Sequence, residues 1–380
     1  MKYVDEFRNR AAADALAASI HAEAEPDRHY HFMEFCGGHT HALSRFGLES
    51  LLPDNITMVH GPGCPVCILP VGRLDMAADL ATRHPEVILT TYGDMMRVPG
   101  TGGRSLLNAR ADGADVRMLY SPLQALDLAR ANPDRHVVFF GIGFETTTPP
   151  TAAAIMAAHK EGLTNFSVFC NHVLTPAAIN AIMGTGTPES RARLDGFVGP
   201  GHVSTIIGAE AYEEPAERWQ KPIIISGFEP NDLLEAILYL VRQTNAGTSF
   251  VDNRFNRAVS PGGNAKAQAL TGRVFALRDT FEWRGLGSIP DSALAVADEF
   301  STFDAERRFD MPTLKRDDHK ACSCANVLRG EMHPRDCKVF GNACTPEHPL
   351  GACMVSSEGA CAAHYQYGRF RDTRPAQAAE

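Results

Sequence analysis

The sequence lacks an excess of positive charge. Its 380 residues include 36 lysines and arginines against 45 aspartates and glutamates, which gives a formal charge of −9. A mildly acidic chain has no general attraction to phosphate backbones or anionic lipids, so we expect neither nucleic acid nor a membrane as a partner. Hydrophobic residues at 44% and charged residues at 21% are ordinary for a globular protein and argue against a disordered chain.

Long apolar segments are also missing. No run is long enough to cross a bilayer. Asp5, Glu6 and Asp14 interrupt the N-terminal region, where a secretory signal would need a continuous apolar segment. We therefore expect a soluble, cytoplasmic protein.

Familiar nucleotide and hydrolase motifs are incomplete or absent. The sequence has no Walker-type phosphate loop, and the turn at 141–146 has Thr146 where the third glycine of a dinucleotide fingerprint belongs. Ser204 and Ser226 lack the surroundings of a nucleophile elbow. These motifs give no support to nucleotide hydrolysis or serine catalysis.

Cysteine, in contrast, is abundant and unevenly placed. Without a secretory signal the ten cysteines should be reduced thiols, which makes metal ligation or redox chemistry a better interpretation than structural disulfides. Three lie near the start, one stands alone in the middle, and six crowd the end of the chain: Cys36, Cys64 and Cys67; Cys170; Cys322, Cys324, Cys337, Cys344, Cys353 and Cys361.

The middle of the chain alternates short buried strands with helical patterns. This alternation predicts an α/β fold with parallel sheets covered by helices on both faces. Glycine-rich turns follow several of the strands, at the edge where ligands bind in such folds. The predicted strands are 87–91, 116–120, 137–140, 166–170, 196–198 and 222–226. Because 245–264 has the composition of a boundary, we expect three parts: α/β domains at 1–130 and 131–245, and a loop-rich, cysteine-rich region at 246–380.

The motif CGGHTH at 36–41 brings a thiol, two glycines and two imidazoles together. Glycines let a metal or another backbone approach closely. His39 and His41 could ligate a metal, accept the proton of Cys36 or hydrogen-bond a ligand. One packed cysteine with two surface histidines is the simpler alternative, but the density of reactive groups favours a functional site.

The motif GPGCPVC at 61–67 holds Cys64 and Cys67 at the spacing of a redox dithiol. Two unrelated buried thiols are the structural alternative. A zinc ion shared with Cys36 or His39 is another, because a second C-x-x-C pair is missing. We favour a reversible dithiol.

The six terminal thiols lie within forty residues among glycine, proline and polar residues, which core packing does not explain. Four thiolates could hold a metal site and leave two over. Thiolate ligands suit zinc or an iron–sulfur cluster. A structural zinc site would leave two cysteines without a role, whereas a cluster beside a redox-active dithiol would use all six, so we favour the cluster. Cys170 and His202 are interpreted as a packed thiol and a loop histidine.

Taken together, the motifs resemble the HypD family of nickel–iron hydrogenase maturation proteins. The matching segments occur in order along nearly the whole chain: FCGGHTH at 35–41, GPGCPVC at 61–67, GFETTTP at 143–149, GFEPNDLL at 227–234 and the stretch 322–361, which ends in GACMVSSEGAC.

The resemblance implies two α/β domains, a third domain with a 4Fe–4S cluster, and a role as a scaffold and redox component in building the Fe(CN)2CO unit of the hydrogenase. It also implies a small HypC-type partner, which holds the iron together with this chain. Cyanide would come from a HypE-type donor working with HypF, and the iron unit would pass to the hydrogenase large subunit.

By the same resemblance, Cys36 is the thiolate that ligates the iron, and His39 and His41 shape its pocket. Cys64 and Cys67 are the dithiol that passes two electrons or holds the iron near Cys36. The remaining assignments concern the tail: Cys337, Cys344, Cys353 and Cys361 are the preferred cluster ligands, with Cys322 and Cys324 as the leftover pair or as alternates.

Two other functions remain open at this point. A free-standing thiol–disulfide oxidoreductase would need Cys64 and Cys67 but not Cys36, and a zinc-stabilised binding protein would need no redox chemistry. Whether the chain is itself an enzyme is left open with them.

Overall fold

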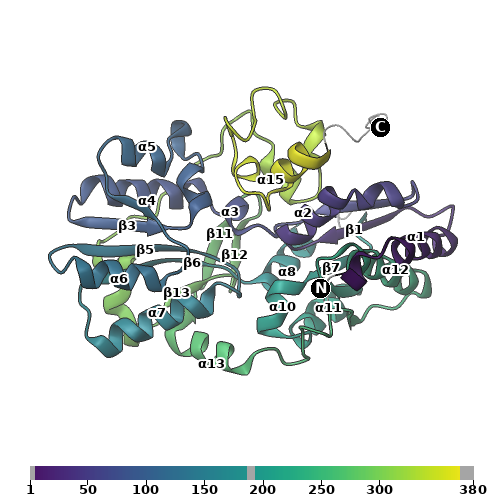
Figure 1. Cartoon of the computed structure of the whole chain (residues 1–380), viewed down its shortest axis with the longest axis horizontal. Helices are drawn as coiled ribbons and strands as arrows, with labels where there is room; N and C mark the ends of the chain where they lie inside the picture. The colour runs from purple at the N-terminus through teal and green to yellow at the C-terminus, as the bar shows by residue number, and fades with distance from the viewer. Residues whose placement is uncertain (1–4, 186–192, 369–380) are drawn as a thin grey trace.

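The computed structural model describes residues 5–185 and 193–368. It contains two parallel β-sheets, and the C-terminal region lies over the junction between them (Figure 1). The predicted α/β class is therefore confirmed. In the described ranges, no helix combines the length and the apolar character that crossing a membrane requires.

The first sheet has five strands in the order β2-β1-β7-β8-β9, and all neighbours are parallel. Its strands are β1 (Tyr30–Glu34), β2 (Ile56–His60), β7 (Gly196–Pro200), β8 (Ile223–Ser226) and β9 (Val251–Asn253). β9 lies inside the segment predicted as a boundary. That segment therefore extends the sheet instead of only linking two domains.

The second sheet has four parallel strands in the order β4-β3-β5-β6. They are β3 (Val87–Thr91), β4 (Val116–Met118), β5 (His136–Gly143) and β6 (Phe166–His172). Every residue of β3, β5 and β6 is buried, as expected for parallel strands that are covered on both faces. Along β5, Val137 and Phe139 join one core, whereas Val138 and Phe140 join the other, because successive side chains of a strand point to opposite faces.

Helices cover the sheets in layers. On one face of the first sheet α1, α2 and α12 enclose a core of their own, and its other face shares a large core with the second sheet and the C-terminal region. The helices are α1 (Arg10–Glu23), α2 (Gly37–Phe46), α3 (Pro65–Ile68), α4 (Val71–Arg83), α5 (Leu106–Ala111), α6 (Leu123–Ala131), α7 (Thr148–Glu161), α8 (Thr175–Thr185), α10 (Gly201–Ile207), α11 (Glu213–Trp219), α12 (Pro230–Ala246), α13 (Ala265–Val274), α14 (Ala305–Arg308), α15 (Cys324–Leu328) and α16 (Ala360–Ala363).

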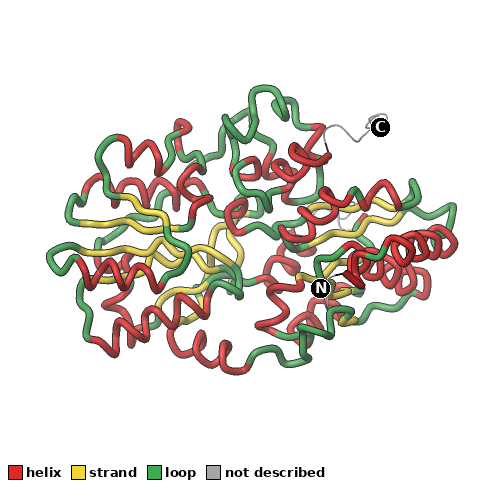
Figure 2. Tube along the Cα trace, viewed as in Figure 1, coloured by secondary structure: helices red, strands yellow, loops and turns green. Residues whose placement is uncertain are grey.

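The C-terminal region contains two short antiparallel pairs followed by loops. β10 (Phe275–Leu277) pairs with β13 (Leu294–Val296), and β11 (Thr280–Trp283) pairs with β12 (Gly287–Pro290). From residue 311 onward loops and very short helices dominate, as Figure 2 shows. This agrees with the loop-rich character predicted from the sequence.

The predicted domain ranges do not correspond to one sheet each. The first sheet takes β1 and β2 from before residue 130 and its other strands from after residue 195, while the second sheet takes strands from both sides of residue 130. Hydrophobic patterns identify strands but not their neighbours in a sheet. The division of the chain at residues 130 and 245 stays a prediction.

Candidate functional site

Turns at the carboxyl edge of the first sheet build the site. The segments after β1, β2, β7 and β8 carry Cys36, Gly63, His202 and Phe228 respectively, and His202 is the second residue of α10. Parallel strands end at a common edge, where α/β proteins bind their ligands. Four motifs that are distant in sequence therefore meet there.

Cys36 lies between β1 and the first turn of α2, and it is only 7% exposed. Its backbone N–H donates to Oε2 of Glu34, 2.9 Å away, and Glu34 is fully buried at the end of β1. The same carboxylate accepts a hydrogen bond from the Thr40 hydroxyl and lies 3.1 Å from Nδ1 of His60 on the neighbouring strand. This network fixes the backbone that carries the thiol.

The two glycines after Cys36 allow close packing on both sides. A Cβ at Gly37 would overlap Glu358 of the C-terminal region, and a Cβ at Gly38 would lie 2.8 Å from Cε1 of Phe228. Larger residues at these positions would therefore push the C-terminal segment or the Phe228 turn away from Cys36.

The two histidines of the motif have different surroundings. His39 is fully buried, its Nε2 lies 3.2 Å from the carbonyl oxygen of Ser226, and its ring packs on Phe228. Burial lowers the pKa of His39 to about 4, so the ring is neutral at pH 7. Its Nδ1 has no hydrogen-bond partner among the described residues. His41 instead contacts the C-terminal segment, with Nδ1 3.4 Å from the carbonyl oxygen of Ser357.

His202 belongs to the site although the sequence interpretation left it out. Its Nδ1 lies 4.0 Å from Sγ of Cys36, and its ring stacks on Phe228 with centroids 3.9 Å apart. The residue is exposed to solvent, and partial desolvation of its ring lowers the pKa of His202. The signal that could have found it is its place after β7, the strand beside β1.

The dithiol loop packs directly against Cys36. A Cβ at Gly63 would overlap the backbone of Cys36, and the N–H of Gly37 donates to the carbonyl oxygen of Gly63, 3.1 Å away. Cys64 and Cys67 form a disulfide at the start of α3, with their Cα atoms 5.2 Å apart. The structure therefore brings the loop of the two disulfide cysteines together with Cys36.

The electrostatic surroundings of Cys36 keep its thiol protonated. Burial raises the pKa of its thiol well above the ordinary value, and the negative charges of Glu358 and Glu34 raise it further. Burial alone would lower the pKa of His60, but its hydrogen bond to Glu34 and the charge of that carboxylate outweigh burial and raise it. The two carboxylates favour the protonated thiol. A bound metal cation would favour the thiolate instead, because metal ligation requires the deprotonated sulfur.

All six terminal cysteines line one pocket of the C-terminal region, together with Val327, Phe340 and Met354. Gly351 belongs to its wall, where a Cβ would overlap Sγ of Cys322. The pocket lies beside the dithiol, because α3 packs against the short helix Ala352–Met354, which carries Cys353. Within the described part of the chain, no three His, Cys, Asp or Glu side chains are arranged as ligands of one metal ion.

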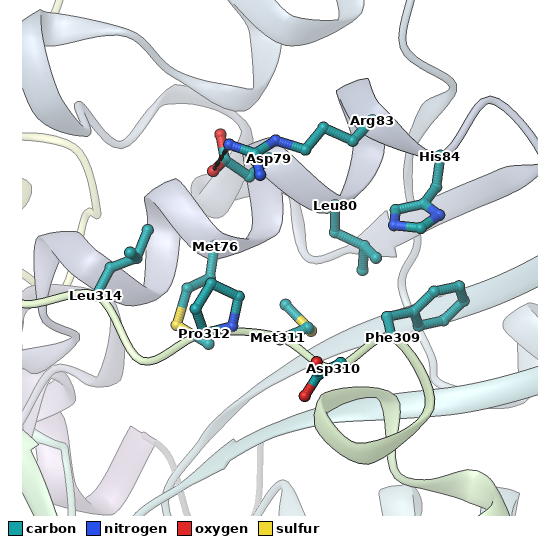
Figure 3. A pocket seen from close by; sticks show the side chains of 10 residues that line it. All are labelled: Met76, Asp79, Leu80, Arg83, His84, Phe309, Asp310, Met311, Pro312 and Leu314. Atoms are coloured by element: carbon teal, nitrogen blue, oxygen red, sulfur yellow. Dashed lines mark hydrogen bonds and ion pairs between the residues drawn. The ribbon is translucent and has the colours of Figure 1, made fainter.

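A second pocket lies between α4 and the segment 309–314 (Figure 3). Its wall is mixed: Met76, Leu80 and Phe309 are apolar, and an ion pair between Arg83 and Asp79 (3.0 Å) also lines it. It contains none of the residues predicted for the site.

Comparison with known proteins agrees with the motifs. The sequence model of the HypD family, described as "Hydrogenase formation hypA family", matches residues 11–368. The hydrogenase maturation factor HypD of Azotobacter vinelandii is 63% identical over 374 residues, which is 98% of both chains. The hydrogenase expression/formation protein HupD of Azotobacter chroococcum mcd 1 is 61% identical over 374 residues, again 98% of both chains. The HypD of Escherichia coli K12 is 45% identical over 372 residues, covering 97% of this chain and 98% of its own.

Proposed function

The chain belongs to the HypD family of hydrogenase maturation factors, and we propose that it is the scaffold on which the Fe(CN)2CO unit of a nickel–iron hydrogenase is assembled with a HypC-type partner. The observation that carries the proposal is the contact of the Cys36 segment with the Cys64–Cys67 loop, beside the cysteine-lined pocket. Cyanide from a HypE-type donor working with HypF would reach the iron here, and the hydrogenase large subunit would receive the product. The reduced thiols that this role requires persist in the cytoplasm, where we propose that the protein acts.

Cys36 is the proposed ligand of the incoming iron. A thiolate is a soft donor that suits iron carrying cyanide and carbon monoxide. Because the free thiol is protonated, binding must release a proton, and Nδ1 of His202 is its proposed acceptor, 4.0 Å from the sulfur. The lowered pKa of His202 keeps its ring neutral at pH 7, the form that can accept a proton, and makes it a weak base, so the transfer depends on the bound metal favouring the thiolate. His39 and His41 would shape the inner wall and the C-terminal wall of this pocket.

Cys64 and Cys67 are proposed to store two electrons as a dithiol. Reduction adds two electrons and two protons to the disulfide and gives two thiols next to Cys36. Both cysteines are buried, with exposed fractions of 3% and 0%. A free-standing oxidoreductase would have to present one of these sulfurs to external disulfides, so the burial favours an internal role.

The cysteine-lined pocket fits a 4Fe–4S cluster in the chemistry of its donors. Soft thiols and apolar side chains form its wall, and Gly351 keeps room beside Cys322 that a side chain would fill. Cys337, Cys344, Cys353 and Cys361 are the proposed ligands, with Cys322 and Cys324 as the remaining pair or as alternates. When bound, such a cluster supplies single electrons.

Anaerobic purification with the HypC-type partner tests the proposal. We expect iron and acid-labile sulfide in the isolated chain, and infrared bands of cyanide and carbon monoxide in the complex. A colourless protein with stoichiometric zinc and no sulfide would contradict the cluster. A complex without those bands, prepared with the cyanide-donating partners present, would contradict the scaffold role.

A further inference from the structure

Arg284 is a buried cation that the proposed mechanism has not used. It follows β11 in the turn that leads to β12, and its side chain is only 2% exposed. Its carboxylate partner, Asp318, has a side chain that is 28% exposed. Burying a guanidinium costs free energy unless nearby groups pair with it, so its position calls for an explanation beyond core packing.

The first set of contacts ties Arg284 to the dithiol loop. Its backbone N–H donates to the carbonyl oxygen of Ile68, 2.7 Å away. Its Nε and Nη2 both donate to the carbonyl oxygen of Leu69, at 3.0 and 2.8 Å. Ile68 and Leu69 directly follow Cys67. The planar guanidinium thereby holds the end of the loop through two donors in a fixed geometry.

The second set of contacts ties the same turn to the cysteine-lined pocket. At Gly285, whose φ is +79°, a Cβ would lie 2.8 Å from Cα of Ala325, the residue after Cys324. The hydrogen bond with the Cys322 thiol lowers the pKa of Cys324, but the interaction with Cys353 and burial outweigh it and raise the pKa, and the charge of Arg284 acts against that rise. The turn therefore lies between the two groups of sulfur atoms.

We propose that Arg284 is a positioning residue for electron transfer: its guanidinium fixes the Cys64–Cys67 loop against the cysteine-lined pocket and stabilises the negative charge that reduction brings to this junction. The inference rests on the proposed redox role of the dithiol. The step is the cleavage of the S–S bond by two electrons, which gives two thiolates. Each thiolate takes up a proton as far as the pH allows, and in slightly alkaline solution a cation in this buried junction favours the thiolate that stays ionised.

The test is the midpoint potential of the Cys64–Cys67 couple. The full-length, cluster-containing protein is equilibrated anaerobically at pH 8 in dithiol–disulfide buffers of defined potential. The thiols are then alkylated, and the modified fraction of Cys64 and Cys67 is measured by mass spectrometry. We expect Arg284→Gln to lower the equilibrium constant for reduction about tenfold, which is ~30 mV for a two-electron couple. Arg284→Lys, which keeps the charge but loses the forked contact, should shift it less.

Arg329→Gln is the matched control. Arg329 donates to the carbonyl oxygen of Gly285 in the same turn at 2.7 Å, and its other partners are Asn326 and Glu331. We expect the midpoint potential of the Cys64–Cys67 couple in Arg329→Gln to equal that of the wild type. An unshifted potential in both Arg284 variants would overturn the inference and leave the dithiol proposal standing. If the wild type shows no reversible couple, both are wrong. If Arg284→Gln fails to fold, the midpoint potential of Arg284→Lys is compared with that of Arg329→Gln. A shift in Arg284→Lys alone supports the inference, and equal potentials overturn it.

Discussion

Replacing Glu145 by glutamine should stabilise the protein above neutral pH and leave it unchanged in acid. Glu145 belongs to the GFETTTP segment after β5 and is only 7% exposed. Burial raises its pKa from the ordinary 4.5 to about 7, although hydrogen bonds from Thr175 oppose the rise. Those bonds come from the backbone N–H (2.8 Å) and the hydroxyl (2.9 Å) of Thr175, at the start of α8.

The sign follows from proton linkage. The unfolded carboxyl loses its proton near pH 4.5, while the folded one keeps it until about pH 7, so stability falls as pH rises between these values. At about 1.4 kcal/mol per pKa unit, the full loss above pH 7 is about 3 kcal/mol. Glutamine cannot ionise, and it can still accept from the N–H of Thr175, so it avoids this loss.

Urea unfolding at pH 5 and at pH 8 measures the effect. At pH 8 we expect the free energy of unfolding of Glu145→Gln to exceed that of the wild type by about 3 kcal/mol, and at pH 5 by no more than about 1 kcal/mol. Equal stabilities at pH 8 would refute the reasoning, because they would mean that the buried carboxylate ionises without cost.

Two further predictions concern residues of the CGGHTH motif. His39→Gln should reduce the loss of stability in acid. Burial lowers the pKa of His39 from 6.5 to about 4, so the wild type loses about 3 kcal/mol of unfolding free energy as pH falls between these values. Urea unfolding measures this loss, and the same loss in His39→Gln would contradict the assignment. Gly38→Ala should cost about 1 kcal/mol net in thermal unfolding, since crowding Phe228 costs about 1–3 kcal/mol and better helix propensity returns about 1. Gly272→Ala, at an open position of α13, should instead gain up to about 1 kcal/mol, and equal changes in the two variants would show that crowding at Phe228 is absent.

The elements of the fold were predictable where the chain is uniformly apolar. The predicted strand at 87–91 coincides with β3, and the runs at 137–140 and 166–170 lie within β5 and β6. β9 was missed because its three residues are only half-buried and lie among glycine, asparagine and proline. The pairing of β1 with β7 was beyond reach, because these strands are more than 160 residues apart in the chain and hydrophobic periodicity carries no information on partners.

The candidate site was predictable where several reactive residues share one motif. Cys36, Cys64 and Cys67 stood out because thiols lie beside glycines, and the structure places their loops in contact. His202 did not stand out, because a single histidine has no spacing to interpret. The structure places it in the first turn of α10, not in a loop, and only the order of the strands brings it to Cys36. Arg284 was missed for the same reason, since its contacts are with backbone carbonyl groups of a distant loop.

The most direct test of the account is whether Cys36 holds the iron. Wild type, Cys36→Ala and Cys170→Ala are each purified anaerobically with the HypC-type partner, and their cyanide and carbon monoxide bands are compared by infrared spectroscopy. Cys170 is a matched control, because it is a buried thiol that donates to the carbonyl oxygen of Leu294 in the core of the second sheet. We predict that the bands vanish in Cys36→Ala and persist in Cys170→Ala; bands of full intensity in Cys36→Ala would contradict the assignment.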